Sequence, residues 1–183
     1  ADLRTLRISA LLGRDEVHMV SPATQALIRG RRVLVTGAGG SIGSELCRQI
    51  AGFAPASLHL LDHDESNLHR LQLETTGSGL LDSDAIVIAD IRDRARIDQV
   101  FSRVRPELVF HAAAHKHLPL LERHPCEGVK SNVLGTQNVV EAAVRSGAER
   151  FILISTDKAA DPTSVLGATK RLAELVVQAG TSG

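Results

Sequence analysis

The sequence predicts an α/β fold, a doubly wound parallel sheet with helices on both faces. Three observations lead to it: short β-rich segments recur along the chain, longer segments of helical periodicity separate them, and glycines follow the first strand. Parallel sheets alternate strand and helix in this way because their crossovers are helical. We expect the sheet to stop after about five strands, where a full dinucleotide-binding sheet has six. The expected strands are residues 32–36, 58–61, 85–89, 108–111 and 151–154.

Residues 1–30 precede the first strand. They carry mixed charges and a Ser21-Pro22 break, so we expect a lead-in segment with one or two short helices. Residues 31–183 are expected to form one domain, because the charge is balanced and 43% of the chain is hydrophobic, enough for a core. The expected helices of this domain are residues 44–50, 65–74, 95–104, 127–145 and 164–179.

A glycine cluster follows the first strand, in the order Gly37-Ala38-Gly39-Gly40-Ser41-Ile42-Gly43. Glycines allow a tight turn and let backbone N–H groups approach a pyrophosphate, which the N-terminus of the next helix also attracts. The spacing Gly-x-x-Gly-x-x-Gly differs from the usual dinucleotide fingerprint, and a plain strand-to-helix turn would also explain it. The ends of the later strands favour the Rossmann-like, dinucleotide-binding interpretation.

Each of the next three strands ends in residues that suit a cofactor site. Asp62 ends the second strand about twenty residues beyond the glycines, where an acceptor for a ribose hydroxyl is expected. No Arg follows it immediately, so NAD is favoured over NADP. Asp90-Ile91 ends the third strand, where Asp90 is either an adenine contact or a turn-forming carboxylate. Ala112-Ala113-Ala114 ends the fourth strand, and such small residues would let a cofactor lie against the backbone.

The fifth strand leads into Ser155-Thr156-Asp157-Lys158, which brings hydroxyls, an acid and an amine together. In open α/β sheets, chemistry takes place just beyond the carboxyl ends of such strands. The helical pattern that follows puts Leu166 and Lys170 one turn apart on one face, so Lys170 can point back toward the same pocket. Without that context, Asp157 and Lys158 would be only a solvated ion pair.

The composition argues against several other classes of protein. A formal net charge of +0 gives no reason to expect a nucleic-acid partner. No apolar stretch approaches a membrane span, and residues 1–20 lack the apolar centre of a signal peptide. Cys47 and Cys126 are too few for a disulfide framework, so a cytoplasmic location is expected. No metal is expected, because the histidines around the fourth strand lack cysteines or carboxylates at ligand spacing. These are His111, His115, His117 and His124.

Five blocks of sequence, taken in order, carry a resemblance. The first residues of the five blocks are, in turn, Thr36-Gly37-Ala38-Gly39-Gly40, His111-Ala112-Ala113-Ala114-His115, Asn132-Val133-Leu134-Gly135, Ser155-Thr156-Asp157-Lys158 and Gly167-Ala168-Thr169-Lys170. Together they resemble the bacterial polysaccharide-biosynthesis nucleotide-sugar dehydratases, the CapD-like branch of the extended short-chain dehydrogenase/reductases. The similarity covers nearly everything after Gly30. Residues 11–15 also resemble the segment before the catalytic domain of the large, membrane-anchored members, which implies a soluble piece of a longer protein.

The resemblance implies 4,6-dehydration of a UDP-sugar partner, UDP-N-acetylglucosamine, with a tightly held NAD. By the family's pattern Thr156 would assist at the C4 hydroxyl, Asp157 would protonate the departing C6 hydroxyl, and Lys158 would take the C5 proton. Lys170 would hold the nicotinamide ribose. The family's sugar-binding lobe lies largely beyond this stretch of sequence, so most of it is expected to be absent. A homo-oligomer is left open, as is an upstream anchor that would hold the full-length protein at the cytoplasmic face of the inner membrane.

The family's pattern and the strand ends assign the binding residues to two groups. His115 and Lys116 would lie at the rim of the pocket and, with Asn132, serve the substrate. The cofactor would contact Gly37, Gly40, Ser41, Ile42, Gly43, Asp62, Asp90, Ile91, Ala112, Ala113, Ala114 and Lys170.

Leu166 departs from the family's pattern, which has Tyr or, in the large membrane-type members, often Met four residues before the Lys. Leu neither donates nor accepts a proton, so a tyrosinate base is excluded. Either Thr156 and its surroundings carry the C4 proton, or the protein is weakened as a catalyst. Two alternatives stay open: a nucleotide-sugar epimerase or dehydrogenase, and a non-catalytic NAD-binding module.

Overall fold

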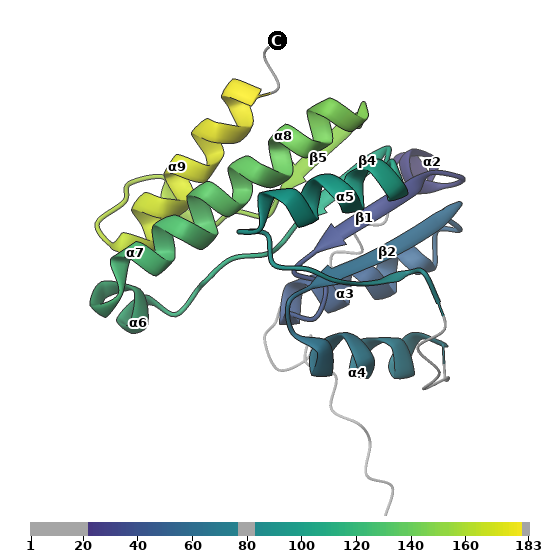
Figure 1. The fold of residues 1–183 in the computed structure, drawn as a ribbon, viewed down its shortest axis with the longest axis horizontal. Coiled ribbons are helices and arrows are strands. Elements are labelled where there is room, and N and C mark those ends of the chain that lie inside the picture. The colour runs from purple at the N-terminus through teal and green to yellow at the C-terminus, as the bar shows by residue number, and fades with distance from the viewer. Residues whose placement is uncertain (1–21, 77–82, 181–183) are drawn as a thin grey trace, which may run out of the picture.

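The computed structural model describes residues 22–76 and 83–180, which form a five-stranded parallel sheet with helices on both faces (Figure 1). The strand order is β3-β2-β1-β4-β5. The doubly wound fold is confirmed, and each expected strand is present at its expected place. The strands are β1 (Arg32–Thr36), β2 (Ser57–Asp62), β3 (Ile86–Ile88), β4 (Leu108–His111) and β5 (Arg150–Leu153).

β1 lies at the centre of the sheet, between β2 and β4. Val33 is paired with Leu58 on one side and with Leu108 on the other. The chain runs outward from β1 to β2 and β3, and then returns to add β4 and β5 on the opposite side. The crossovers therefore diverge beyond the carboxyl ends of β1 and β4, which is where ligands bind in open α/β sheets.

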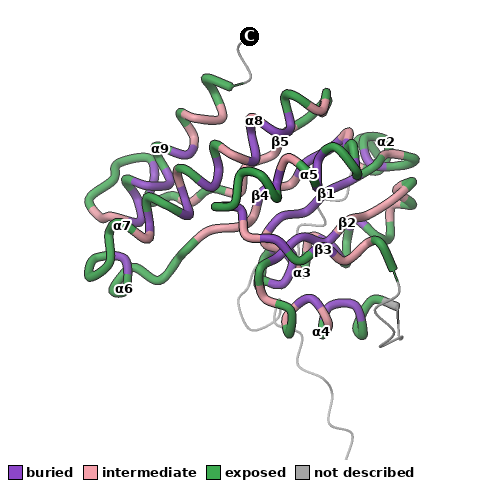
Figure 2. The backbone as a smooth tube through the Cα atoms, in the orientation of Figure 1, coloured by how far each residue is buried: buried purple, intermediate pink, exposed green. Residues whose placement is uncertain are grey.

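Helices cover both faces because the side chains of β1 alternate between two apolar clusters. Leu34 packs in the cluster that α5 and α8 cover, whereas Val33 and Val35 pack in the cluster under α2, α3 and α4. Figure 2 shows buried residues along the central strands and on the sides of the helices that face them. The helices are α2 (Pro22–Ile28), α3 (Ser41–Ala51), α4 (Glu65–Thr76), α5 (Arg94–Val104) and α8 (Thr136–Ser146).

The last part of the expected lead-in segment packs on the domain. α2 is one of the short helices expected there, and its Ile28 is buried in the second cluster. The Gly30 N–H donates to the Ala54 carbonyl at 2.9 Å, which holds the chain where it enters β1. Residues 1–21, the rest of the lead-in segment, lie outside the described residues.

The single helix expected over residues 127–145 is interrupted. In its place α7 (Pro125–Gly128), a π-helix (Val129–Gly135) and α8 follow one another. The Thr136 hydroxyl donates to the Asn132 carbonyl at 2.7 Å, and a side chain that bonds a backbone carbonyl competes with regular helical pairing. A Cβ on Gly135 would lie only 2.6 Å from Cδ1 of Ile91, so this turn lies directly against the loop after β3. Such π-turns occur frequently at functional sites.

Three helices complete the fold around the end of β5. α9 (Val165–Gly180) was expected and packs against α8 and the π-helix. α6 (Leu118–Arg123) and a single 3₁₀ turn (Asp157–Ala159) were not expected. Glu122 on α6 accepts a hydrogen bond from the Val165 N–H at 2.8 Å, which fixes the first turn of α9.

Candidate cofactor cavity and active site

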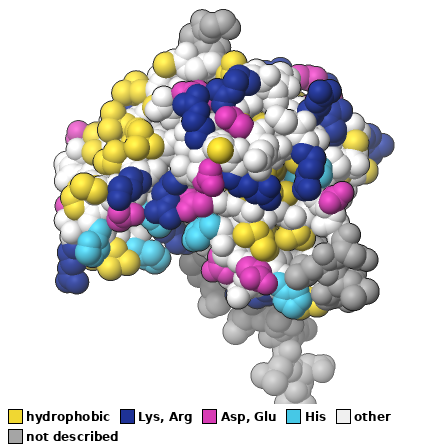
Figure 3. Space-filling model, viewed as in Figure 1, with side chains coloured by type: hydrophobic (Ala, Val, Ile, Leu, Met, Phe, Trp, Pro, Cys, Tyr) yellow, Lys and Arg dark blue, Asp and Glu magenta, His cyan; other side chains and the backbone are white. Residues whose placement is uncertain are grey.

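A cavity of about 360 Å³ lies at the carboxyl ends of β1 to β4. Its walls are the glycine turn after β1, residues 61–64 after β2, residues 89–92 after β3 and residues 112–117 after β4. These are the strand ends at which the sequence predicted a cofactor site. On the face shown in Figure 3, acidic and basic side chains are intermixed.

The glycine turn is packed too tightly for side chains at two of its positions. Gly37 has a φ of +70°, and a Cβ there would lie 2.5 Å from the backbone nitrogen of Ala113. A Cβ on Gly43 would lie 2.0 Å from the Gly37 carbonyl oxygen. The start of α3 at Gly40 has no hydrogen bond from a capping side chain among the described residues. The N-terminus of α3, where Ser41 and Ile42 are exposed, is therefore a suitable place for an anion.

Asp62 joins this turn to the end of β2. The residue is 8% exposed and lies in the cavity wall. Oδ2 accepts from the Gly39 N–H at 2.9 Å, and Oδ1 accepts from the Asp64 N–H at 3.0 Å. A carboxylate can accept about four hydrogen bonds, so Asp62 keeps capacity for a ligand hydroxyl.

The third and fourth walls bring five more of the expected cofactor residues to the same cavity, whose lining does not include the expected residues Ser41, Ile42, Gly43 and Lys170. Asp90 and Ile91 line it after β3, and residues 112–114 line it after β4. His115 and Lys116 are exposed at its rim, as expected. The Lys116 amine donates to the Ser41 hydroxyl at 2.8 Å, which places Lys116 beside the start of α3, on the cofactor side of the site.

The segment after β5 lies outside the residues that line this cavity. Asp157 and Lys158 are exposed, with their side chains 88% and 51% accessible, and Nζ of Lys158 lies 3.4 Å from Oδ1 of Asp157. The Thr156 hydroxyl donates to Asp157 at 2.9 Å, and this bond, followed by those from Lys158, lowers the pKa of the Asp157 carboxyl. A general acid at this position must carry a proton, which the described neighbours of Asp157 do not favour.

Lys170 and Leu166 lie on the buried face of α9, one turn apart, as expected. Nζ of Lys170 donates to the Ile154 carbonyl at 2.6 Å, so the amine does point back to the end of β5. Burial lowers the pKa of Lys170, and the charge of Glu174 opposes that effect. Leu166 is 7% exposed and brings no polar group to this surface.

Asn132, which was expected to support the active site and was grouped with the substrate residues, does not line the cavity. The residue is 1% exposed, and its amide is satisfied inside the protein. Oδ1 accepts from the His115 N–H at 2.8 Å, while Nδ2 donates to the His115 carbonyl and to the Thr169 hydroxyl, both at 3.0 Å. Asn132 therefore ties the loop after β4 to the residue before Lys170.

Sequence reasoning missed several residues of the site. Arg92 lines the cavity and pairs with Asp90, while Asn138 donates to the Ile91 carbonyl at 3.0 Å. The position of Arg92, two residues after a carboxylate in a turn, was an available signal. Asn138 lies 47 residues from Ile91, and no local pattern announces that contact. Within residues 22–76 and 83–180, no cluster of three or more His, Cys, Asp or Glu could hold a metal ion.

The sheet, the glycine turn and the cavity at the switch point define a Rossmann-like α/β protein. The chain belongs to the polysaccharide biosynthesis protein family, whose family model matches residues 33–182. Among the helices of the described residues, none combines the length and the apolar character that spanning a membrane requires.

Relatives of known name support this assignment. The probable polysaccharide biosynthesis protein EpsC of Bacillus subtilis is 47% identical over 176 residues, which are 96% of this chain and 29% of EpsC. UDP-N-acetylglucosamine 4,6-dehydratase (inverting) of Campylobacter jejuni is 33% identical over 147 residues, which are 79% of this chain and 42% of that enzyme. The chain thus spans less than half the length of these relatives.

A solved structure shows the same fold. The X-ray structure of Pen from Bacillus thuringiensis superposes with a TM-score of 0.74 at 30% sequence identity. The match covers 89% of this chain and 47% of that chain. This chain therefore matches slightly less than half of the Pen chain.

Proposed function

We propose that residues 31–183 are the cofactor-binding half of a UDP-N-acetylglucosamine-type 4,6-dehydratase that acts in surface polysaccharide biosynthesis. The observation that carries the proposal is the arrangement at the carboxyl edge of the sheet. A cavity with a glycine turn and a buried carboxylate lies at the ends of β1 to β4, and the neighbouring strand β5 leads into Thr156, Asp157 and Lys158. The similarity to a dehydratase of this specificity supports the choice of reaction.

The cavity suits NAD. The glycine turn would admit the pyrophosphate at the start of α3, and Lys116 would add a positive charge there. Asp62 would accept from the hydroxyls of the adenosine ribose. A 2′-phosphate at this position would face the carboxylates of Asp62 and Asp64, which supports NAD over NADP. When bound, the nicotinamide would accept a hydride from C4 of the sugar and return it at C6.

The residues after β5 would handle the protons. The Thr156 hydroxyl would assist at the C4 hydroxyl, since Leu166 leaves no phenol at the position where one is usual. Oxidation at C4 acidifies the C5 proton, which neutral Lys158 would remove. Asp157 would then protonate the departing C6 hydroxyl. Lys170 would hold the nicotinamide ribose from its place beneath the end of β5.

Asp157 would require help from outside the described residues to act as the acid. Its carboxyl is exposed, and Thr156 and Lys158 stabilise the charged form. A bound sugar would exclude water from this surface, and the substrate diphosphate would add negative charge nearby. Both effects raise the pKa of a carboxyl, so the acid would form in the substrate complex.

The partner of this site would be a UDP-sugar. We place the protein in the cytoplasm, or at the cytoplasmic face of the inner membrane if the complete protein is anchored upstream. The sugar would be bound mostly by a lobe that the family places after this stretch of sequence. Because catalysis depends on holding C4 and C5 in reactive geometry, residues 31–183 alone would bind NAD and fail to dehydrate.

The test is to incubate the complete protein with NAD and UDP-N-acetylglucosamine and to analyse the sugar nucleotide by mass spectrometry and NMR. Dehydration produces a 4-keto-6-deoxy sugar that has lost one water. A product of unchanged mass and inverted C4 would instead identify an epimerase. If the protein binds NAD but the sugar stays unchanged over prolonged incubation, the protein is a non-catalytic cofactor-binding module.

A further inference from the structure

Glu174 joins the middle of α9 to the loop that follows β5. Its Oε1 accepts from the Ser155 hydroxyl at 2.6 Å, and its Oε2 accepts from Nη1 of Arg171 at 2.9 Å. A different donor therefore holds each carboxylate oxygen, and the side chain of Glu174 is fixed in one orientation. Ser155 is the residue directly before Thr156, so this contact reaches the group of side chains that would handle the protons.

The same face of α9 makes two more contacts with this segment. A Cβ on Gly167 would lie 2.4 Å from the carbonyl oxygen of Lys158, so the helix lies directly against the 3₁₀ turn. Nζ of Lys170 donates to the Ile154 carbonyl at 2.6 Å. Residues 167, 170 and 174 are spaced three and four apart, which places them on one face of a helix. α9 thus contacts the segment after β5 at three successive points.

The side chains that these contacts position bond to one another. The Thr156 hydroxyl donates to Asp157 at 2.9 Å, and the amine of Lys158 lies 3.4 Å from the same carboxylate. Within the described residues, all hydrogen bonds of these three side chains are made inside the group. Their position relative to a bound sugar therefore depends on where the backbone carries them. A misplacement of about 1 Å can lower a reaction rate by a factor of about 100.

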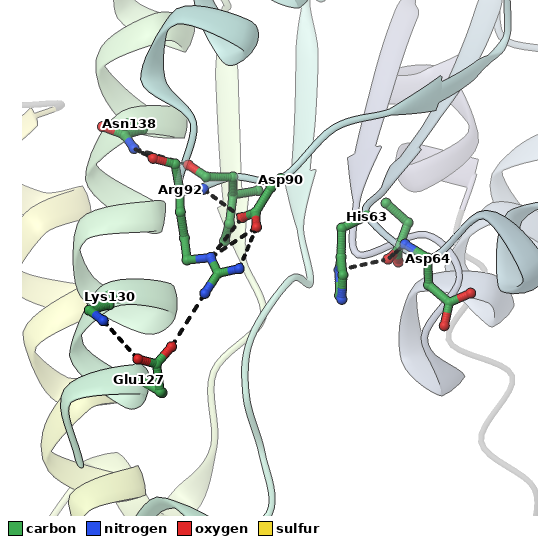
Figure 4. Close-up of polar contacts among 9 residues, drawn as sticks. His63, Asp64, Asp90, Arg92, Glu127, Lys130 and Asn138 are labelled. Carbon is green, nitrogen blue, oxygen red and sulfur yellow. Dashed lines mark hydrogen bonds and ion pairs between the residues drawn. The ribbon is translucent and has the colours of Figure 1, made fainter. Parts of the chain in front are cut away.

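Glu127 on α7 shows a different arrangement (Figure 4). It accepts from Nζ of Lys130 at 2.7 Å and from Nη1 of Arg92 at 3.3 Å, so both of its donors are cations. Ion pairs between exposed side chains hold each other weakly and are screened by salt. Glu174 instead accepts one of its bonds from a neutral hydroxyl. Because the serine hydroxyl is only one carbon from the backbone, the bond from Ser155 to Glu174 restrains the main chain as well.

We infer that Glu174 is a positioning residue for the proposed reaction. Through the Ser155 hydroxyl it holds the loop after β5 in the orientation that presents Thr156 and Lys158 to the sugar. Its charge also favours the protonated form of Lys170. The inference rests on the proposed function and adds to it a residue outside the lining of the cavity. Because Glu174 holds the loop through Ser155, loss of one partner and loss of both should displace the loop equally.

Glu174 supplies the negative charge that acts on Lys170. Burial lowers the pKa of Lys170, and the charge of Glu174 raises it. The bond from Ser155, followed by that from Arg171, lowers the pKa of Glu174, which therefore stays ionised at neutral pH. His111, which interacts with Lys170 from β4, is neutral because burial lowers its pKa to about 3. Lys170 must keep its proton to donate to two acceptors, so activity should fall as pH rises through its pKa. Without the charge of Glu174, this decline should begin at a lower pH.

The experiment measures kcat for dehydration, and the exchange of the substrate's C5 hydrogen with deuterium from solvent, in the complete protein. Ser155→Ala and Glu174→Ala should each lower both rates by about tenfold or more and leave KM within about threefold, because misplaced groups slow the chemical step. The double variant should be no slower than Glu174→Ala. Glu174→Gln keeps an oxygen that can accept from Ser155 but loses the charge. It should keep most of kcat at neutral pH, and its alkaline decline should begin at a lower pH than in the wild type.

Glu141→Gln on α8 is the matched control. Glu141 is also an acid with a partly exposed side chain, 30% accessible against 24% for Glu174, and it pairs with Arg94 at 2.7 Å. Its other partners are Gln137 and Arg145, and it does not line the cavity. Glu141→Gln removes the same charge from the protein and should keep the kcat and the pH profile of the wild type.

The possible outcomes separate the inference from the proposed function. If the complete wild-type protein neither dehydrates the sugar nor exchanges its C5 hydrogen, the proposed function fails and the inference fails with it. If the wild type is active but Ser155→Ala and Glu174→Ala keep its kcat, or if their effects add in the double variant, the inference is wrong while the proposed function stands. Should the alanine variants not fold, as judged by circular dichroism, an unchanged pH profile in Glu174→Gln would overturn the inference.

Discussion

Nε2 of His111 lies 2.9 Å from the hydroxyl oxygen of Thr136, and the His111 side chain is completely buried. That hydroxyl already donates its proton to the Asn132 carbonyl, so it can only accept from the ring. Nε2 therefore carries the proton of the neutral ring. Nδ1, 2.6 Å from the Thr36 hydroxyl, must accept from it. One histidine in a single tautomer thus ties β1 and β4 to the first residue of α8.

This arrangement predicts a loss of stability in mild acid. Burial, with the charge of Lys170 as a second cause, lowers the pKa of His111 from 6.5 to about 3 in the folded chain. The unfolded chain binds a proton below about pH 6.5 that the folded chain refuses, so stability is present above that pH and declines as pH falls toward 3. From pH 7 to pH 5, His111 alone should remove about 2 kcal/mol from the free energy of unfolding, measured with urea.

An NMR titration assigns the effect to His111. Its ring resonances should stay unchanged between pH 7 and pH 5, because its pKa in the folded chain lies near 3. A His111 signal that titrates near pH 6.5 would contradict the lowered pKa and the loss of stability that follows from it.

A second prediction concerns the glycine turn. Gly43→Val should abolish NAD binding and lower the free energy of unfolding by about 1–3 kcal/mol or more, because its Cβ would lie 2.0 Å from the Gly37 carbonyl oxygen and push the turn out of shape. Gly52→Ala, at the other end of α3, is the control, since its Cβ would lie 3.3 Å from the nearest atom. Calorimetry with NAD and urea unfolding measure both effects, and wild-type affinity in Gly43→Val would contradict the placement of the pyrophosphate.

A third prediction concerns Asp62 and the choice between NAD and NADP. Asp62→Ala should weaken the binding of NAD by about tenfold, because the variant loses an acceptor for the 2′-hydroxyl. The affinity for NADP should stay unchanged or rise slightly, because the variant also loses a charge that repels a 2′-phosphate. The lost bond to the Gly39 N–H affects both cofactors alike, so the ratio of their affinities isolates the contact with the ribose. Asp84→Ala, an acid whose side chain is 95% exposed, controls for net charge. Equal ratios in both variants would place the ribose elsewhere.

The strands and the cofactor wall could be predicted from sequence for a simple topological reason. Each strand is a local run, and parallel strands bring their carboxyl ends to one edge whatever the side chains between them do. Asp62, Asp90 and residues 112–114, far apart in the sequence, therefore had to meet once the fold class was known. The glycine turn could be predicted on the same basis.

The missed features depend on contacts between distant residues. Periodicity gave one helix over residues 127–145, but the π-helix reflects the bond of Thr136 to Asn132 and the packing of Gly135 on Ile91. Asn132 was expected to support the active site, but its partners could not be named, because His115 and Thr169 lie 17 and 37 residues away. A pattern of neighbouring residues cannot predict contacts between residues so far apart in the sequence.

A fourth prediction tests the proposed base. In the complete protein, Lys158→Ala should stop the exchange of the substrate's C5 hydrogen with deuterium from solvent, which NMR follows directly. NAD affinity should stay within about twofold of wild type, because Lys158 does not line the cavity. Lys130→Ala removes a comparably exposed lysine from the π-helix and should leave the exchange intact. Normal exchange in Lys158→Ala would assign the base to another residue.

The last prediction asks whether Leu166 is compatible with catalysis. If the Thr156 hydroxyl carries the C4 proton, Leu166→Tyr in the complete protein should turn over substrate no faster than Leu166→Phe, since both add a ring to a buried position and only one adds a hydroxyl. Leu166→Met, which restores the residue common in the large membrane-type members, should match wild type within about twofold, because Leu and Met are similar in volume. The measurement is kcat for formation of the 4-keto-6-deoxy sugar. A gain of about tenfold or more for Tyr over Phe would mean that the phenol supplies a missing proton carrier, and that Leu166 limits the enzyme.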